Sequence, residues 1–206
     1  KKEEADRYFA RLIYMIVIVG VILSSIGCNF RRPIAVLLGA SDEIIGDCVV
    51  YGRILMVANT FFMLQNSFQS FLVTAEKPQM GFVISLIAGC TNVVLDFLLV
   101  YVLRMGILGA ALATTISQFI GSVVPLIYFI KSKNSLLQLV RTKIDFRILK
   151  KACANGSSEM LTNISASFVG MMYNFQLIKI AQENGVAAYG VIMYVNFIFM
   201  SFFFGY

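Results

Sequence analysis

The stretch GCTNVVLDFLLVYVLRMGILGAALATTISQ, residues 89–118, holds two apolar runs separated by the short turn 104–106. A helix of about 20 residues crosses the hydrocarbon core of a bilayer, and a turn this short makes two such helices antiparallel neighbours. The first run carries Asn92 and Asp96 near its middle. A carboxylate at the centre of a membrane helix costs about 2.5–3.5 kcal/mol even on the most lenient insertion scale. A residue that costly indicates a functional role.

Similar apolar runs fill most of the chain. The 206 residues are 59% hydrophobic and 14% charged, whereas a soluble domain is typically about 45–50% apolar and about 25% charged. These runs are continuous and do not alternate as the strands of a barrel do. We therefore predict an all-α polytopic membrane protein. Five complete spans and one truncated span are expected, over 8–30, 48–74, 80–103, 107–130, 148–180 and 186–206.

Basic residues are concentrated at alternate ends of these spans. Twelve of the 17 lie at three places: before or in the first turn of the first span, between the second and third spans, and between the fourth and fifth spans or in the first turn of the fifth. The positive-inside rule then places the N-terminus in the cytoplasm and the turn at Arg104 outside. The net charge of +6 thus reports orientation, and no nucleic-acid partner is expected. We interpret the long basic connection, about 131–147, as a cytoplasmic linker that rests on anionic headgroups.

The residue types present make an enzyme improbable. The chain has no histidine, and its four cysteines are far apart, so histidine metal sites, Ser-His-Asp triads and C-x-x-C motifs are excluded. No catalytic group of residues is visible, and we expect neither an enzyme nor a bound cofactor.

Polar side chains in the third and fourth spans predict one cluster inside the bilayer. Asn92 and Asp96 are four residues apart and share a helix face, as do Thr114 and Gln118 on the next span. Asp96 lies about 12 Å inside the outer end of its helix, near the midplane. Oxygen ligands of this kind suit Na⁺ or a proton held by the carboxylate. The alternative is a hydrogen-bonded packing contact in which Asp96 is neutral.

Two further polar stripes have open interpretations. In the second span, Gln65, Asn66 and Gln69 either line a cavity or join helices. In the fifth span, Glu159 and Asn163 belong to a stripe that must face a cavity or other helices rather than lipid. The small residues of 106–117 predict close helix packing.

The stretch 89–118 resembles the fifth and sixth helices of the multidrug and toxic compound extrusion (MATE) transporters, with an asparagine four residues before an aspartate and then a G-A-A-x-A-T run. LLGASDEI, NGSSEMLTNIS and GVAAYGVIMYVNFIF also fit, and suggest the bacterial MepA-like branch. The resemblance implies the third to eighth helices of a twelve-helix, two-lobe protein, so that this sequence is a piece of a longer chain. Residues 1–147 would then hold the last four helices of the N-lobe and the linker, and residues 148–206 the first two helices of the C-lobe.

The same resemblance implies a function and a site. A MATE transporter exports organic cations or drugs in exchange for Na⁺ or H⁺, and we expect one that works as a monomer in the bacterial plasma membrane. The family's N-lobe cation site maps onto Asn92, Asp96 and Thr114. Glu159 lies nearer the start of its helix than the family's second carboxylate, so that role is not transferred. The alternative is a flippase for lipid-linked sugars or other lipid precursors, which would favour basic residues in its cavity, whereas the intramembrane charges here are acidic.

The predicted topology assigns each cysteine a side of the membrane. We expect Cys28 and Cys48 near the outer surface, Cys90 within the bilayer and Cys153 near the cytoplasm, because of the asymmetry of basic residues. In intact cells that express the full-length protein, a membrane-impermeant thiol reagent should label the first pair more readily than Cys153. Preferential labelling of Cys153 would overturn this orientation.

Overall fold

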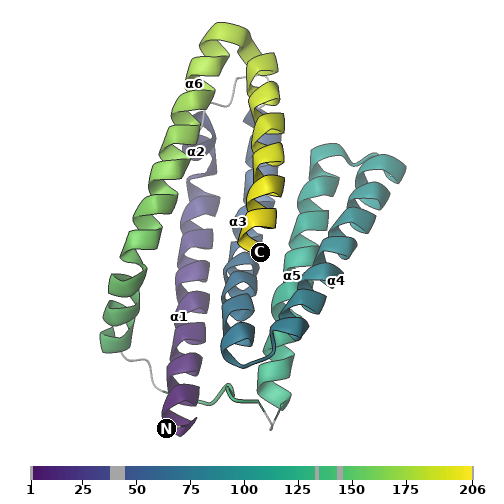
Figure 1. Ribbon diagram of the computed structural model, residues 1–206. Helices are drawn as coiled ribbons and strands as arrows, with labels where there is room; N and C mark the ends of the chain where they lie inside the picture. Colours follow the sequence, from purple (N-terminus) through teal and green to yellow (C-terminus); the bar gives the residue numbers. More distant parts are fainter. Residues whose placement is uncertain (1, 38–44, 133–134, 143–145, 206) are drawn as a thin grey trace. The chain divides into compact units, whose positions relative to one another are not determined.

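The computed structural model describes residues 2–37, 45–132, 135–142 and 146–205 (Figure 1). Every regular element in these ranges is helical, which confirms the all-α prediction. The stretch GASDEI, quoted above for its resemblance, and parts of the linker lie outside the described residues. The elements are α1 (Lys2–Asn29), α2 (Arg31–Leu37), α3 (Ile45–Thr74), α4 (Pro78–Asp96), the π-helix η1 (Phe97–Val102), α5 (Gly106–Lys131) and α6 (Phe146–Gly205).

Four of the described helices are long and apolar enough to cross a membrane, and they match the first four predicted spans. The fifth predicted span forms the first part of α6 but does not reach this apolarity, because its stripe of Asn, Glu and Ser residues lowers the mean hydropathy. The apolar part of the sixth is the segment Asn184–Met200. The short helix α2 was not predicted, since it lies in a stretch interpreted as a connection.

The chain forms two compact units, Lys1–Cys153 and Ala154–Tyr206. The second unit is a pair of helices within α6, because Gln182 breaks the helix with φ 51° and ψ −145°. Tyr173 and Tyr189 join this pair by stacking, with ring centroids 5.5 Å apart. The break falls between the predicted fifth and sixth spans. The predicted lobe boundary at residues 147 and 148 stays a prediction.

In the first unit, α3 packs against α1 and α5, and α4 packs against α5 (Figure 1). Small residues let these helices approach closely, as is common inside membranes. A Cβ atom on Gly20 of α1 would lie 2.9 Å from Thr60 Oγ1 of α3, and one on Gly109 of α5 would lie 3.0 Å from the backbone carbonyl of Leu99 in η1. The close packing predicted for residues 106–117 is therefore confirmed at Gly109.

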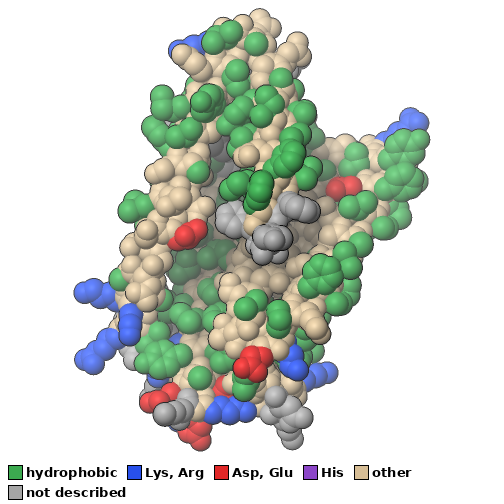
Figure 2. Space-filling model, in the orientation of Figure 1, with side chains coloured by type: hydrophobic (Ala, Val, Ile, Leu, Met, Phe, Trp, Pro, Cys, Tyr) green, Lys and Arg blue, Asp and Glu red, His purple; other side chains and the backbone are tan. Residues whose placement is uncertain are grey.

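The outward side of α4 and η1 is apolar. Phe82, Val93 and Tyr101 are 69%, 68% and 74% exposed, and Figure 2 shows hydrophobic side chains along this arm of the first unit. A bilayer covers such surfaces with lipid chains. These exposed residues are therefore what a membrane-spanning helix requires.

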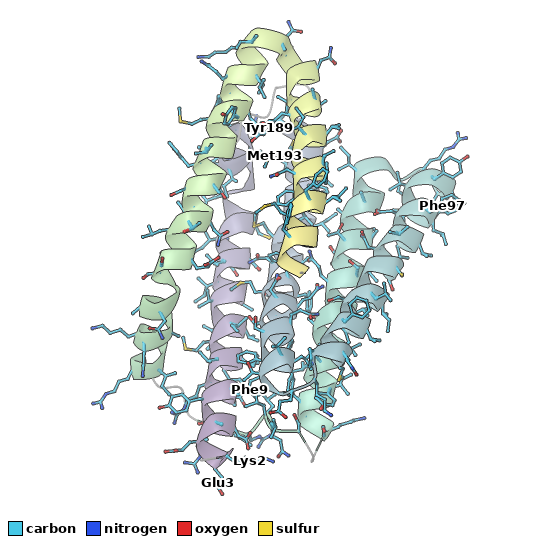
Figure 3. All side chains as sticks on the ribbon, in the orientation of Figure 1. Lys2, Glu3, Phe9, Phe97, Tyr189 and Met193 are labelled. Carbon is cyan, nitrogen blue, oxygen red and sulfur yellow. The ribbon has the colours of Figure 1, made fainter. Side chains whose placement is uncertain are left out.

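A buried apolar core lies where α1 begins, α3 ends, α4 begins and α5 ends. Phe9, Phe68 and Phe129 form its centre, with Phe129 ring centroids 4.8 Å from Phe9 and 5.8 Å from Phe68. Figure 3 labels Phe9 in this region, a short way along α1 from Lys2. By the positive-inside argument, this is the cytoplasmic end of the unit.

Replacing Phe129 tests this core. Phe129 is fully buried, and removing its ring deletes contacts with Phe9 and Phe68 that no neighbour can replace. We expect Phe129→Ala to lower the free energy of unfolding by about 3 kcal/mol, measured as a lower unfolding midpoint of the full-length protein in detergent. The control is Phe82→Ala, at a residue exposed on α4, which should change the midpoint little. Equal midpoints for the two variants would contradict the assigned core.

Candidate functional site

A polar cavity of about 270 Å³ lies between α3, α4 and α5. Each helix contributes residues spaced three or four apart, so each presents a single face to the cavity. None of the lining residues carries a charge. They are Phe62, Gln65 and Asn66 of α3, Ser85, Ala88, Gly89 and Asn92 of α4, and Thr114, Ser117 and Gln118 of α5.

The structure brings together three of the four residues of the predicted intramembrane cluster. Asn92, Thr114 and Gln118 all line the cavity, from the two helices that the turn at 104–106 makes antiparallel. Asp96 does not line it. Asp96 is the last residue of α4 and lies one helical turn beyond Asn92 on the same face, about 6 Å along the axis.

Asp96 has an unusual environment for a carboxylate. Its Oδ1 atom is buried and accepts no hydrogen bond from the described part of the chain. A buried carboxylate oxygen without a partner is costly, so this atom is a candidate position for a bound cation. The described residues hold no cluster of three or more His, Cys, Asp or Glu side chains fit for a metal ion.

The π-helix η1 begins directly after Asp96. Its wider turns hydrogen-bond Leu103 N–H to Leu98 O at 2.9 Å and Met105 N–H to Leu99 O at 2.9 Å. π-helical turns occur frequently at functional sites. Gly109 of α5 packs on the backbone of Leu99 and so supports the turn from one side.

The three polar residues of α3 take both of the roles considered for them, which were to line a cavity or to join helices. Gln65 and Asn66 line the cavity. Gln69 joins two helices instead, since its Nε2 atom donates to Ser85 Oγ at 2.7 Å and to the Gly81 carbonyl at 3.3 Å. This contact lies one turn from Gln65 and fixes α3 against α4 beside the cavity.

Glu159 and Asn163 belong to the second unit and are exposed on α6. Asn163 Nδ2 donates to the Glu159 carbonyl at 2.9 Å, and Ser167 Oγ donates to the Asn163 carbonyl at 2.8 Å. The predicted stripe is thus a continuous row on one helix face. Neither Glu159 nor Asn163 is among the residues that line the cavity, and a role for either stays a prediction.

Sequence reasoning missed Ser85 and Ser117 as lining residues. Both follow from the spacing, because Ser85 lies seven residues before Asn92 and Ser117 lies three after Thr114. Serine is common in membrane helices, where it usually bonds its own backbone, as Ser117 Oγ does with the Thr114 carbonyl at 2.8 Å. A serine alone therefore gave little signal.

These features define a multi-pass helical membrane protein with a polar cavity between three of its helices. A family model described as MatE matches residues 1–98. The multidrug export proteins MepA of Staphylococcus saprophyticus and Staphylococcus aureus are 26% and 24% identical to the chain over 180 residues, which cover 87% of the chain and 40% of each relative. The chain thus spans about two fifths of the length of these curated relatives.

Solved structures agree with this likeness. An inward-facing multidrug resistance MATE family transporter of the MOP superfamily matches 91% of the chain and 43% of its own length, with a TM-score of 0.82 and 23% identity. A MOP superfamily transporter from Pyrococcus furiosus, described as having a binding pocket of reverse polarity that suggests a different function, matches 95% of the chain and 44% of its own length, with a TM-score of 0.81 and 22% identity. The resemblance to the MATE transporters drawn from the sequence is confirmed, and so is the all-α, multi-pass fold. The bacterial relatives also support the plasma membrane as its location.

The contact between Gln65 and Gly121 tests how the cavity is built. A Cβ atom on Gly121 of α5 would lie 2.7 Å from Cδ of Gln65, so Gly121→Ala should displace Gln65 and destabilise the full-length protein by about 1–3 kcal/mol. The double variant Gln65→Ala/Gly121→Ala should lose less than the sum of the two single variants, measured from unfolding midpoints in detergent. Gly89→Ala, which meets no atom within 4 Å, is the control. Strict additivity would show that the two residues do not touch.

Proposed function

We propose that the protein is a secondary multidrug antiporter that exports organic cations or drugs in exchange for Na⁺ or H⁺. The observation that carries the proposal is the buried, unpartnered carboxylate oxygen of Asp96, one turn from a cavity lined by neutral oxygens and amides. The similarity to MepA multidrug export proteins supports the substrate class. A monomer in the plasma membrane, without a nucleic-acid partner and without enzymatic activity, completes the proposal.

Asp96 is the residue that exchanges the ion in this mechanism. When a proton or Na⁺ leaves, the carboxylate is charged while its buried Oδ1 atom has no hydrogen-bond partner among the described residues, which favours a rearrangement that supplies one. When the ion binds, the charge is neutralised and that driving force disappears. Asn92 and Thr114 supply neutral oxygens that replace part of the water around an entering Na⁺. The charged and the neutralised forms of Asp96 thus favour different conformations of the transporter.

A flippase for lipid-linked sugars or other lipid precursors is the alternative within the same superfamily. The fold does not separate the two functions, because a transporter described as having a different function matches almost as well. Charge favours the antiporter, since an acidic residue beside the cavity suits a cationic substrate. Export of anionic lipid precursors, without any effect of Na⁺ or pH gradients on drug efflux, would favour the flippase.

The substitution Asp96→Asn in the full-length protein separates transport from folding. It removes a costly charge from the bilayer, so the variant should reach the membrane in at least the parent amount. Drug efflux should fall to the level of cells without the transporter, because an amide neither takes up a proton nor binds a cation well. Asn92→Ala and Thr114→Val should reduce efflux less, since each removes one neutral ligand.

The matched control is Asp47→Asn, at an exposed aspartate in the first turn of α3, and it should leave efflux unchanged. Drug transport into inside-out vesicles, measured once with only a Na⁺ gradient and once with only a pH gradient, identifies the coupling ion. Normal abundance of Asp96→Asn with normal efflux would show that Asp96 is only a packing contact and would end this proposal.

A further inference from the structure

Residues 135–142, named here the strap, follow α5 and return to the start of α1. Gln138 donates its backbone N–H to Asp6 Oδ1 at 2.8 Å. Arg11 Nε donates to Thr142 Oγ1 at 3.2 Å. The backbone N–H of Leu139 donates to the carbonyl of Phe129 on α5 at 3.1 Å. The strap is thus held by side chains of α1 and by the backbone of α5.

The strap is also inserted into the apolar core. Leu137 is 8% exposed and belongs to the cluster formed around Phe9 and Phe129. Ser135 is 2% exposed, and its Oγ accepts the backbone N–H of Leu137 at 3.4 Å. This part of the linker therefore packs on the protein, with an apolar side chain in the core. That the linker rests on anionic headgroups stays a prediction.

Asp6 is the anchor of the strap. It is 6% exposed, and a carboxylate so buried needs hydrogen bonds that replace its water. A hydrogen bond to a carboxylate is charge-assisted and stronger than a neutral one. Undocking the strap would break this bond and would also expose Leu137 and the core beneath it. The strap therefore stays docked only with Asp6 beneath it, and Asp6 stays buried only while the strap is docked.

We propose that the strap stays docked on α1 and α5 while the transporter changes conformation, so that the N-lobe ends at Thr142 rather than at the end of α5. The docked state rests on the contacts alone, whereas its persistence during transport rests on the proposed function. Under this arrangement the strap moves together with the N-lobe, because Asp6 and Arg11 hold it on α1. Asp6 acts as a positioning residue far from the polar cavity.

Cross-linking tests the docked state. In the full-length protein with the native cysteines replaced by serine, Arg11→Cys/Thr142→Cys keeps the anchor Asp6 and should form a cross-link in high yield with a short bis-methanethiosulfonate, because Arg11 and Thr142 are in contact. The matched control is Ala5→Cys/Thr142→Cys, because Ala5 is exposed and six positions from Arg11, on another side of the helix. Yields should not change when a drug and an ion gradient drive turnover. Equal yields for the two pairs, or a yield that falls during turnover, would overturn the proposal.

Transport by the cross-linked protein gives the second measurement. Efflux from reconstituted vesicles should be the same before and after cross-linking of the Arg11→Cys/Thr142→Cys variant. Loss of efflux that reduction restores would show that the strap must undock, and would overturn the proposal. If the uncross-linked parent shows no efflux with any gradient, the proposed function fails, while the cross-linking yields still decide whether the strap is docked.

Proteolysis tests the anchor separately. Arg141 is exposed within the strap, and a docked backbone resists trypsin. In inside-out vesicles, Asp6→Ala should be cleaved after Arg141 several-fold faster than the parent, whereas Asp6→Asn, which keeps an oxygen acceptor, should resemble the parent. Equal cleavage of the parent and Asp6→Ala would overturn the anchoring role of Asp6.

Discussion

The close approach of α3 to its neighbours is the constraint on which the first unit depends. Lipid chains are as apolar as leucine, so membrane helices associate through tight packing and hydrogen bonds rather than through the hydrophobic effect. Glycines provide the necessary contact points, and two of them receive glutamine side chains of α3: Gly121 accommodates Gln65, and Gly81 accommodates Gln69. The same contacts that bring the helices together therefore draw polar groups of α3 inward. The polar cavity is a direct product of how the bundle packs.

The cavity and the apolar core lie next to each other along the same helices. Leu64 and Phe68 of α3 and Ile84 of α4 belong to the core, while Gln65 of α3 and Ser85 of α4 are next to them in sequence and line the cavity. Where the two regions meet, Gln69 and Ser85 bond across α3 and α4. The aromatic core and the polar cavity thus border each other directly along α3 and α4.

Much of this arrangement was predictable from the sequence, because helix periodicity is local. Runs of about 20 apolar residues predicted the first four helices, and the short turn at 104–106 predicted that Thr114 and Gln118 lie near Asn92, as they do in the cavity lining. The absence of Asp96 from the cavity lining was not predictable, since periodicity gives the helix face of a residue but not how far a cavity extends along that face. The docking of Leu137 was missed for a different reason. An amphipathic pattern identifies a buried side without telling whether protein or lipid covers it.

The π-helix after Asp96 has a consequence for comparing this chain with its relatives. A π turn holds more residues than an α turn, so η1 accommodates additional sequence without disturbing the α-helical register of Asn92 and Asp96 below it. A relative that lacks one residue between Phe97 and Val102 would show an alignment gap at this point and would still present the same face to the cavity. Such a gap would reflect the length of the turn after Asp96 and not a change in the proposed ion site. Alignments that force this helix to be gapless would instead misplace either the Asn–Asp pair or the glycine-rich run that follows.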